Sequence, residues 1–362
     1  GWLANGSVVM NLTVEGECNS SVPYLGMIAG FSNGATITNC TAKGRVNNTC
    51  SGSSLLGTGG ILGYCSFNGT VRSIEGCVNY AEVSSTLGNV GGILGTMYYP
   101  VTITKCVNYG SISGNKDNVG GILGYGCSNN YSFTMSDCAN YGNVTTKSSN
   151  VAGLVGFVCP MQGTVIKNCY VGPCAVRGDE NTFVTTFEPS GFYTSFSNIV
   201  YSQDCKVYTS YNASSPASLS DNIANSSYNT SDAFVGVSAT QIAAGEATYL
   251  LNGAVNGGAT WTQDLSHSEN QPALFGDADL YGVYLMGYAH GATARSFSND
   301  ANKKNSLHPA ADDSGSHDAH FGYTSNHNQT HDALCAVCGY TEHDEACDMV
   351  GDVCSKCLYE LL

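Results

Sequence analysis

Charged side chains are scarce in this chain. Asp, Glu, Lys and Arg make up 11% of its 362 residues, against roughly 25% in ordinary soluble domains. Their place is taken by 44 glycines, 22 tyrosines and many Ser, Thr and Asn residues. This composition predicts a surface of hydroxyl and amide groups, as in many exposed extracellular β proteins.

Basic residues and long apolar runs are scarce too. Residues 1–178 carry a net charge of +2 and residues 179–362 carry −17. Phosphate backbones are bound by clustered Lys and Arg, so we expect no nucleic-acid partner. The sequence contains no run of about 18 apolar residues, so we expect no membrane span within it. Because the chain begins at Gly1 without Met, we interpret it as a fragment whose signal peptide and any anchor lie outside it.

The residues that usually perform catalysis are missing from the first half. No His precedes His267, and neither a Ser-centred elbow nor a phosphate-binding loop occurs. Among the few early carboxylates, only Glu15 and Glu17 are close in sequence. Acid–base and glycosidase chemistry needs clustered carboxylates with a suitable partner. We therefore expect this chain not to be an enzyme.

Two short phrases recur along the first half. The first is glycine-rich: "LGMIAGF" at 25–31, "TGGILGY" at 58–64, "VGGILGT" at 90–96, "VGGILGY" at 119–125 and "VAGLVGF" at 151–157. The second is "NCTAKGRV" at 39–46, "CVNYAEV" at 77–83, "CVNYGSI" at 106–112, "CANYGNV" at 138–144 and "NCYVG" at 168–172. Successive copies of the first phrase are offset by 33, 32, 29 and 32 residues. A period near 30 with short β-prone pieces predicts a solenoid. The alternative is a β-sandwich with chance repeats.

In a parallel β-helix, equivalent residues of successive coils lie about 4.8 Å apart. Asn79, Asn108 and Asn140 should then form a ladder of side-chain amides, with Tyr80, Tyr109 and Tyr141 stacked beside them. The glycines are expected at tight corners between strands. Alternation in "VTITKCV", residues 101–107, does not decide which face points inward.

The phrases "NVGGILG" and "KCVNYGSISG" resemble the GLUG-type repeats of bacterial surface and adhesin-like proteins. The resemblance covers about residues 1–178. It implies a right-handed parallel β-helix, display on a cell surface and no known catalysis by the repeats. This sequence differs from the usual pattern in carrying Cys before the Asn-Tyr pair.

Twelve of the 17 cysteines lie within residues 1–205. Five of them occupy equivalent repeat positions: Cys40, Cys77, Cys106, Cys138 and Cys169. Stacked positions lie within Cα range of a disulfide, but their expected Cβ separation exceeds the mean of about 3.8 Å. We favour a buried thiol ladder. Local bridges, including Cys169–Cys174, remain the alternative, because spacing does not determine connectivity.

The repeats end near residue 178. Residues 211–232 are rich in Ser and Asn and predict a loop or linker. A helix is expected after an N-cap at Ser238, ending at Asn252-Gly253. Open solenoid ends expose unpaired backbone, so we expect this helix and the segment after it to cap the solenoid.

The same segment resembles a tail found after GLUG arrays. The matching residues are Gly245, Glu246, Tyr249, Leu250, Leu251, Asn252, Trp261, Gln263, Pro272, Leu274 and Phe275. Glu246 and Trp261 could suggest sugar binding, but a buried Trp and a cap carboxylate are the simpler interpretation.

The C-terminal "HDALCAVCGYTEHDEACDMVGDVCSKC", residues 331–357, contains the sharpest chemical motif. Its two C-x2-C pairs are Cys335 with Cys338 and Cys354 with Cys357. Their spacing predicts a structural, zinc-ribbon-like site with four thiolate ligands. His331, His343 or Cys347 could replace one thiolate. Two disulfides are the alternative in an oxidising compartment.

These observations divide the chain into four parts: GLUG-type β-helix repeats at 1–178; the end of the solenoid, a linker and a cap at 179–290; a polar His/Asp-rich linker at 291–330; and the Cys-rich module at 331–362. The predicted function is that of a non-catalytic extracellular or cell-surface stalk or adhesin-like scaffold. Its possible partners are glycans and surface proteins of host or neighbouring cells, and structural zinc is the one possible cofactor. The alternative is a carbohydrate-binding accessory region of a larger secreted enzyme.

Overall fold

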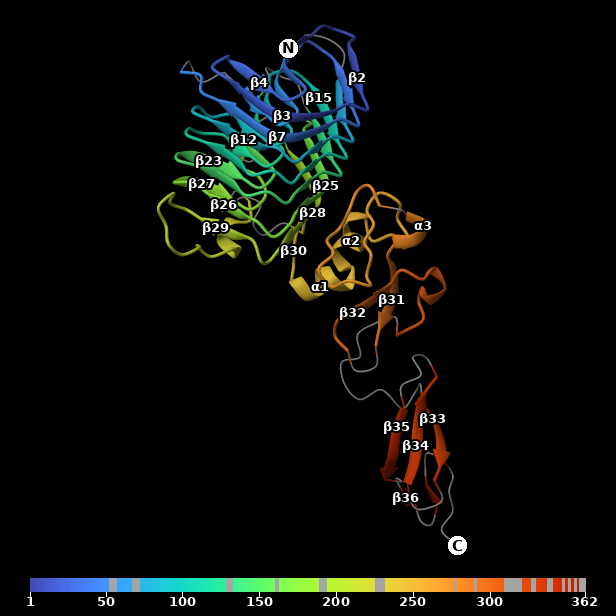
Figure 1. Cartoon of the computed structure of the whole chain (residues 1–362). Coiled ribbons are helices and arrows are strands. Elements are labelled where there is room, and N and C mark those ends of the chain that lie inside the picture. The colour runs from blue at the N-terminus through green and yellow to red at the C-terminus, as the bar shows by residue number, and fades with distance from the viewer. Residues whose placement is uncertain are drawn as a thin grey trace. The chain divides into compact units, whose positions relative to one another are not determined.

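A computed structural model gives the fold of the chain (Figure 1). It describes residues 1–51, 57–66, 72–127, 133–159, 163–188, 194–224, 232–276, 278–289, 292–308, 321–326, 330–336, 341–346, 349–350, 353–354 and 357. The chain forms two compact units. Unit 1 comprises Gly1–Ile242 and Leu250–Ala254, and unit 2 comprises Ala243–Tyr249 and Val255–Leu362.

Unit 1 is a parallel β-helix with three sheets, which confirms the predicted solenoid. The first sheet contains β1 (Trp2–Leu3), β5 (Ala29–Ser32), β9 (Leu62–Cys65), β14 (Leu94–Met97), β19 (Leu123–Gly126) and β24 (Val155–Val158). The second contains β4 (Tyr24–Gly26), β8 (Gly57–Gly59), β13 (Val90–Gly91), β18 (Val119–Gly120), β23 (Ser149–Ala152) and β27 (Glu180–Phe183).

The third sheet has 18 strands, because each coil contributes more than one short strand to it. They are β2 (Val8–Met10), β3 (Thr13–Ser20), β6 (Thr36–Thr38), β7 (Thr41–Asn48), β10 (Arg72–Glu75), β11 (Val78–Asn79), β12 (Glu82–Ser85), β15 (Val101–Thr104), β16 (Val107–Asn108), β17 (Ile112–Gly114), β20 (Thr134–Ser136), β21 (Ala139–Asn140), β22 (Val144–Thr146), β25 (Val165–Val171), β26 (Ala175–Arg177), β28 (Ser195–Ser202), β29 (Lys206–Tyr208) and β30 (Phe234–Val237).

The repeated glycine-rich phrases lie in vertical register. Gly91 is the Cα partner of Gly59 on one side and of Gly120 on the other. Leu94 is likewise paired with Leu62 and Leu123. The leucines are buried and belong to one continuous hydrophobic core. Each coil therefore supplies the backbone partners of the next, as a solenoid requires.

Left-handed corners decide which residues of each coil point inward. Ile103 in β15 is fully buried, whereas Thr104 is half-buried on the outer side. Lys105 then adopts a positive φ of 52°, and both Cys106 and Val107 after it are buried. The corner breaks the strand alternation, so the simple two-residue period does not hold across it.

Asparagine occupies most of the other left-handed corners and forms ladders there. Asn89, Asn118 and Asn150 all have positive φ values. The side chain of Asn118 donates to Asn89 Oδ1 at 2.8 Å, and that of Asn150 donates to Asn118 Oδ1 at 3.0 Å. Asn tolerates the left-handed region better than most residues, and stacking gives its amide a partner.

The predicted interior amide ladder is present. Asn79 Nδ2 donates to Asn108 Oδ1 at 2.7 Å, and Asn108 Nδ2 donates to Asn140 Oδ1 at 2.7 Å. All three side chains are fully buried. A Cβ added at Gly92 would come within 2.4 Å of the Asn108 side chain. The second glycine of "GGILG" is thus required by close packing against this ladder, in addition to the corner role that the sequence suggests.

The five cysteines at equivalent repeat positions are buried free thiols. Cys77 Sγ donates to the carbonyl oxygens of Glu75 and Ile37, and Cys106 repeats this arrangement one coil further along. The favoured thiol ladder is therefore what the structure contains. A disulfide joins Cys127 to Cys159 in neighbouring coils instead.

The solenoid extends past the repeats that sequence reveals. β28 pairs with β25, and β30 pairs with β28. The short 3₁₀ helix η1 (Ser220–Asn222) precedes Ile223, whose carbonyl accepts from Thr185 N at 2.9 Å. Ile223 belongs to the hydrophobic core. Part of the expected loop at 211–232 thus accepts hydrogen bonds from the backbone N–H groups of Val184 and Thr185, which follow β27.

The expected single helix is two short helices, α1 (Ala239–Ala244) and α2 (Glu246–Leu251). Ser238 caps α1 as predicted, because its Oγ accepts from Gln241 N at 3.3 Å and Gln241 Oε1 accepts from Ser238 N. Gly245 has a φ of 99°, which breaks the helix there.

The rest of unit 2 contains short elements. They are α3 (Ala278–Tyr281), β31 (Tyr284–Tyr288), β32 (Arg295–Ser298), the 3₁₀ helix η2 (Ala301–Lys303), β33 (Phe321–Ser325), β34 (Thr330–Cys335), β35 (Thr341–Ala346), β36 (Met349–Val350) and β37 (Val353–Cys354). β31 and β32 form an antiparallel hairpin, β33–β35 an antiparallel sheet, and β36 and β37 a second hairpin.

Candidate functional site

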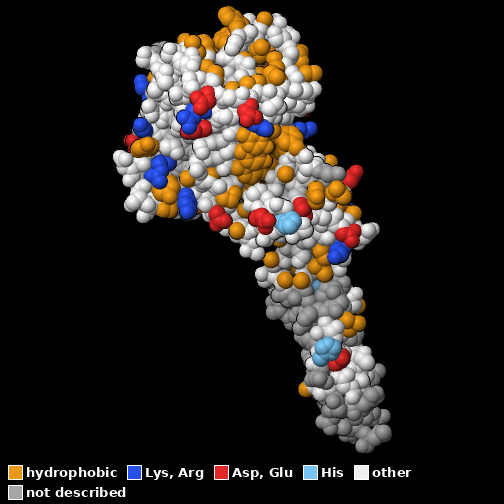
Figure 2. All heavy atoms as spheres, viewed as in Figure 1, with side chains coloured by type: hydrophobic (Ala, Val, Ile, Leu, Met, Phe, Trp, Pro, Cys, Tyr) orange, Lys and Arg blue, Asp and Glu red, His pale blue; other side chains and the backbone are white. Residues whose placement is uncertain are grey.

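A column of tyrosines lies on the outer surface of the third sheet. Tyr80 and Tyr109 have ring centroids 5.0 Å apart with planes 7° apart, and Tyr109 and Tyr141 repeat this at 5.0 Å and 10°. Tyr80 and Tyr109 are 51% and 44% exposed. The rings cover one another's faces, so solvent meets mainly their edges. Figure 2 shows hydrophobic side chains gathered in a column on the visible face, with charged groups beside them.

The length of this column follows from the repeat sequence. Asn79 pairs with Ala42 in the preceding coil, so Lys43 occupies the position of that coil that is equivalent to Tyr80. Asn140 pairs with Val171 in the next coil, so Gly172 occupies the position of that coil that is equivalent to Tyr141. The coils before and after these three lack the Asn-Tyr pair, so the parallel stack contains three tyrosines.

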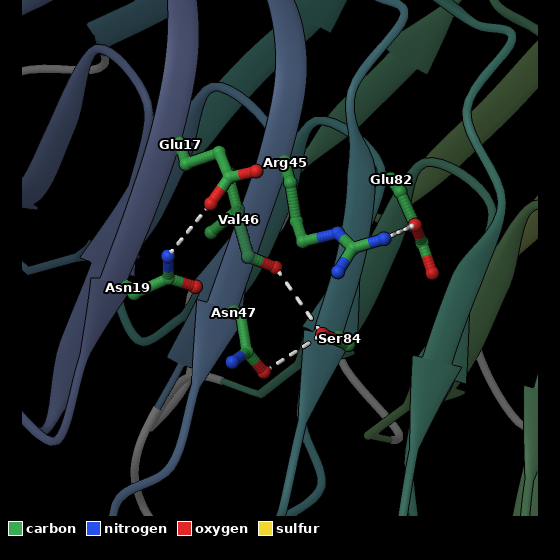
Figure 3. Close-up of polar contacts among 7 residues, drawn as sticks. All are labelled: Glu17, Asn19, Arg45, Val46, Asn47, Glu82 and Ser84. Carbon is green, nitrogen blue, oxygen red and sulfur yellow. Dashed lines mark hydrogen bonds and ion pairs between the residues drawn. The ribbon is translucent and has the colours of Figure 1, made fainter.

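Polar side chains form parallel columns beside the tyrosines. On β3, β7 and β12 they include Asn19, Asn47 and Ser84 (Figure 3). Ser84 Oγ donates to Asn47 Oδ1 at 3.0 Å. The columns continue through Ser113 and Thr145 on the next coils. We call these columns and the three tyrosines together the tyrosine face.

The charges on the tyrosine face are arranged as pairs. Arg45 Nη2 lies 2.9 Å from Glu82 Oε2, and both side chains are about half exposed. Figure 3 shows Arg45 between Glu17 and Glu82, and Glu17 accepts a hydrogen bond from Asn19. An exposed pair of this kind contributes about 0–1 kcal/mol. These groups therefore orient one another on the surface more than they stabilise the fold.

Burial, together with the neighbouring Tyr80, raises the pKa of Tyr109 above its usual value. A tyrosine hydroxyl is protonated at neutral pH even at the usual value of 10.0, so that of Tyr109 can donate as well as accept hydrogen bonds. Each of the three coils that carry a tyrosine also presents hydroxyl or amide groups on this face, and such groups form hydrogen bonds with polyhydroxylated or amide-bearing molecules.

The candidate sugar-binding residues of the tail are enclosed. Trp261 is fully buried, and Glu246 is buried with its carboxylate bound by Arg295. This favours the simpler interpretation of a packed Trp and a paired carboxylate. Tyr249 and Phe297 pack nearby with ring centroids 5.4 Å apart.

The structure describes only part of the predicted metal site. Cys335 is buried at the end of β34, and Cys357 is half-buried. Cys354 lies on β37 and His331 on β34, and only their backbones are described. His343 on β35 is exposed, with Nδ1 3.0 Å from Asp332 Oδ2. Cys338 and Cys347 lie outside the described residues.

Sequence reasoning missed a neighbour of Cys335. His308 Nε2 lies 3.4 Å from Cys335 Sγ, and both side chains are buried. No spacing signal indicates His308, which is 27 residues away within the segment interpreted as a linker. Across the described residues, no three His, Cys, Asp or Glu side chains converge as a metal site.

Comparisons with known proteins do not identify a family. No family model matches the chain, and no curated protein matches it. One similar solved structure is the crystal structure of a candidate immunoglobulin A1 protease from Bacteroides ovatus. It is 16% identical with a TM-score of 0.48, over 74% of this chain and 75% of that one. Similarity at this level carries no conclusion about activity.

In the part of the chain that the structure describes, no helix has the length and hydrophobicity needed to cross a bilayer.

Proposed function

We propose that this chain is a non-catalytic, extracellular surface scaffold built from GLUG-type repeats, whose tyrosine face contacts glycans or surface proteins of host or neighbouring cells. The stacked tyrosines, of which Tyr80 and Tyr109 are about half exposed, carry the proposal. Large aromatic side chains are usually withdrawn from water, and a row of them on an outer surface is characteristic of recognition.

The regular register of the solenoid supports a scaffold role. β3, β7, β12, β17, β22, β26 and β29 follow one another as hydrogen-bonded neighbours. Their outer side chains are therefore held at a constant spacing of about 4.8 Å. A ligand with repeated polar groups can meet equivalent side chains on several coils at once, so weak contacts can add together.

The carboxylates of the tyrosine face support binding more than catalysis. Glycosidases place two carboxyl groups across an open gap that receives the sugar. Here Arg45 lies between Glu17 and Glu82 and is paired with Glu82 (Figure 3). This arrangement suits orientation of polar groups on a surface.

The disulfide between Cys127 and Cys159 supports an extracellular or cell-surface location, because disulfides persist in oxidising compartments. The surface rich in hydroxyl and amide groups is consistent with the same location.

Glycan-array binding tests the proposal directly. We expect the full chain to bind a subset of glycans, and the double variant Tyr80→Ala/Tyr109→Ala to lose most of that signal. Tyr281→Ala is the matched control, because Tyr281 is a partly exposed tyrosine on α3, in unit 2. Circular dichroism of each variant checks that the solenoid is retained.

Two results would count against glycan contact by this surface. One is the absence of binding by the full chain to every glycan tested. The other is binding that survives the double variant unchanged. A pull-down with intact host or bacterial cells, using the same three proteins, tests surface proteins as the ligand.

A further inference from the structure

Cys174 and Cys205 occupy equivalent positions in neighbouring coils, at the end of the interior amide ladder. Ala175 is the Cα partner of Lys206, and each cysteine immediately precedes one of these residues. Lys206 N donates to Cys174 O at 2.9 Å, which fixes this register. Asn140 Nδ2 donates to Cys174 Sγ at 3.9 Å. The two sulfur atoms therefore continue the ladder into the next two coils.

A hydrogen bond joins the two thiols. Its presence raises the pKa of Cys174 well above the usual value and lowers the pKa of Cys205, so Cys174 is the donor and Cys205 the acceptor. Cys205 Sγ in turn donates to Gly172 O at 3.1 Å. Of the two sulfurs, Cys205 is therefore the one that more readily becomes the nucleophilic thiolate.

The disulfide between Cys127 and Cys159 shows that the spacing of the coils accommodates a bridge. Its two cysteines lie in neighbouring coils, with Cα atoms 4.9 Å apart. Cys174 and Cys205 are also one coil apart, and neighbouring coils are separated by about 4.8 Å. Disulfides usually have Cα separations of about 4.4–6.8 Å. The backbone of this second pair therefore needs no rearrangement to form a bond.

Exposure distinguishes this pair from the thiol ladder. The five ladder cysteines are 0% exposed, whereas Cys174 and Cys205 are 7% and 6% exposed. Cys205 lies in a turn, in which its N donates to Ser202 O at 3.2 Å. A reagent in solvent therefore reaches Cys174 and Cys205 more readily than it reaches the ladder.

The structure also decides between two partners for Cys174. The sequence leaves a local bridge to Cys169 open. Cys169, however, is the Cα partner of Ile199, and its Sγ donates to Lys167 O at 3.2 Å. Cys174 meets the thiol of Cys205 instead.

We propose that Cys174 and Cys205 are a redox-responsive pair, which closes to a disulfide between neighbouring coils when the chain meets a small disulfide such as glutathione disulfide. The Cys205 thiolate attacks one sulfur of the reagent and releases the first glutathione thiolate. The Cys174 thiolate then attacks the Cys205 sulfur of the mixed disulfide and releases the second. The two protein thiols lose two protons and two electrons, and the reagent is reduced to two thiols.

The bond would tie the last coil of the sequence repeats to the coil that follows it. A cross-link of this kind restricts the unfolded chain and so favours the folded state. The proposal is independent of what the tyrosine face binds, because neither cysteine belongs to that surface.

Peptide mapping of the unmodified full chain tests the pairing. The chain is reduced, equilibrated in its native state with glutathione disulfide, blocked with N-ethylmaleimide and digested with trypsin. Cleavage after Lys167, Arg177 and Lys206 places Cys169 and Cys174 in peptide 168–177 and Cys205 in peptide 178–206. We expect these two peptides to be joined with the loss of two hydrogen masses, and fragmentation to locate the bond at Cys174.

The same digest contains an internal positive control. The bridge between Cys127 and Cys159 joins peptide 117–147 to peptide 148–167. Its recovery shows that the oxidation conditions are sufficient.

Thermal unfolding measures the effect of the bond on stability. Oxidation should raise the melting temperature of Cys174→Ser and of Cys205→Ser less than that of the unmodified chain, by a difference of about 4 °C or more. Cys18→Ser is the matched control and should behave like the unmodified chain, because Cys18 is a half-buried thiol on β3, far from the pair in sequence.

Three results would overturn the proposal. The first is full alkylation of both Cys174 and Cys205 in a sample whose Cys127–Cys159 peptides are joined. The second is a bond between Cys169 and Cys174 inside peptide 168–177. The third is an equal rise in melting temperature for Cys205→Ser and Cys18→Ser. Because the first two are read from the unmodified chain, the test does not depend on the folding of any variant.

Discussion

Asn108 forms hydrogen bonds in three directions from a fully buried position. Its Nδ2 donates to Gly110 O at 2.9 Å and to Asn140 Oδ1 at 2.7 Å, and its Oδ1 accepts from Asn79 Nδ2. Each amide of the ladder therefore holds a corner of its own coil and joins the next coil. A buried polar group of this kind stabilises the fold only while all its partners remain.

Asn108→Ala should lower the free energy of unfolding by about 2–4 kcal/mol, because it removes three hydrogen bonds and leaves neighbouring amides unsatisfied. Urea denaturation followed by circular dichroism measures the loss. Ser113→Ala on the outer surface is the control and should change stability by about 0.5 kcal/mol or less. Equal stabilities of the two variants would contradict the structural role of the ladder.

Tyr64 links stability to alkaline pH. Burial, reinforced by the nearby Tyr24, raises the pKa of Tyr64 from 10.0 to about 12. The raised pKa means that the folded state favours the neutral phenol. Its contribution to stability is therefore fully present below pH 10 and is lost as the pH rises toward 12.

Unfolding free energies measured between pH 9 and pH 12 should consequently decrease for the unmodified chain. Tyr64→Phe should show a smaller decrease over the same range, because it has no phenol to ionise. Parallel curves for the two proteins would show that Tyr64 does not contribute to this linkage.

At the scale of the elements, the two repeated phrases are halves of one packing arrangement. The second glycine of each "GGILG" copy lies against the asparagine of a "CVNYG" copy: Gly60 against Asn79, Gly92 against Asn108 and Gly121 against Asn140. The glycine of one phrase and the asparagine of the other pack against each other, so the two phrases must be considered together. A side chain at this glycine would overlap both the amide ladder and the carbonyl oxygen of the equivalent glycine in the next coil.

Gly92→Ala should destabilise the solenoid strongly, by about 3 kcal/mol or more, because the new Cβ would overlap backbone and Asn108 atoms. Gly126→Ala is the matched control. Its Cβ would lie closest to the ends of the Leu123 and Phe133 side chains, at 3.1 Å and 3.3 Å, and in ordinary contact with Phe157 O at 3.7 Å. Thermal unfolding of both variants measures the difference, and similar melting temperatures would contradict the packing described.

The thiol ladder runs through the hydrophobic core beside these strands. Burial raises the pKa of the Cys138 thiol well above its usual value, so the reactive thiolate is disfavoured. We expect the five ladder cysteines to resist alkylation by N-ethylmaleimide in the native protein and to react after denaturation. Cys18, which is half-buried, should react in the native state.

Peptide mass spectrometry before and after denaturation measures the extent of alkylation at each cysteine. The bridge between Cys127 and Cys159 should leave both of these cysteines unlabelled until a reductant is added. Native labelling of Cys106 to the extent seen at Cys18 would contradict the buried ladder.

Sequence alone predicts the solenoid and its Asn and Tyr ladders, because both depend on the repeat period of about 30 residues, which the sequence shows directly. It does not predict which face of residues 101–107 points inward, because the corner at Lys105 reverses the alternation. Nor does it predict the helix break at Gly245, or the contact between His308 and Cys335. These depend on backbone conformation and on contacts between segments that no repeat relates.

At the scale of the whole molecule, the solenoid of unit 1 is stabilised mainly between neighbouring coils. Its first coil has exposed apolar side chains, including Trp2 at 72% and Met10 at 56%, whereas Leu62, Leu94 and Leu123 of the central coils are almost completely buried. Function at this scale depends on length and register, because the tyrosine face exists only where successive coils align. The proposed surface role therefore rests directly on the stacking of coils.

Electron–electron distance measurements test that stacking most directly. Spin labels carried by a ketone-bearing amino acid can be placed at exposed positions of one outer column: Glu17, Asn143 and Lys206. Strand register places Asn143 four coils and Lys206 six coils from Glu17. Coils about 4.8 Å apart predict backbone separations of about 19 Å and about 29 Å. Two narrow distributions that differ by about 10 Å would agree with stacked coils. Equal distances, or a shorter distance to Lys206 than to Asn143, would contradict them.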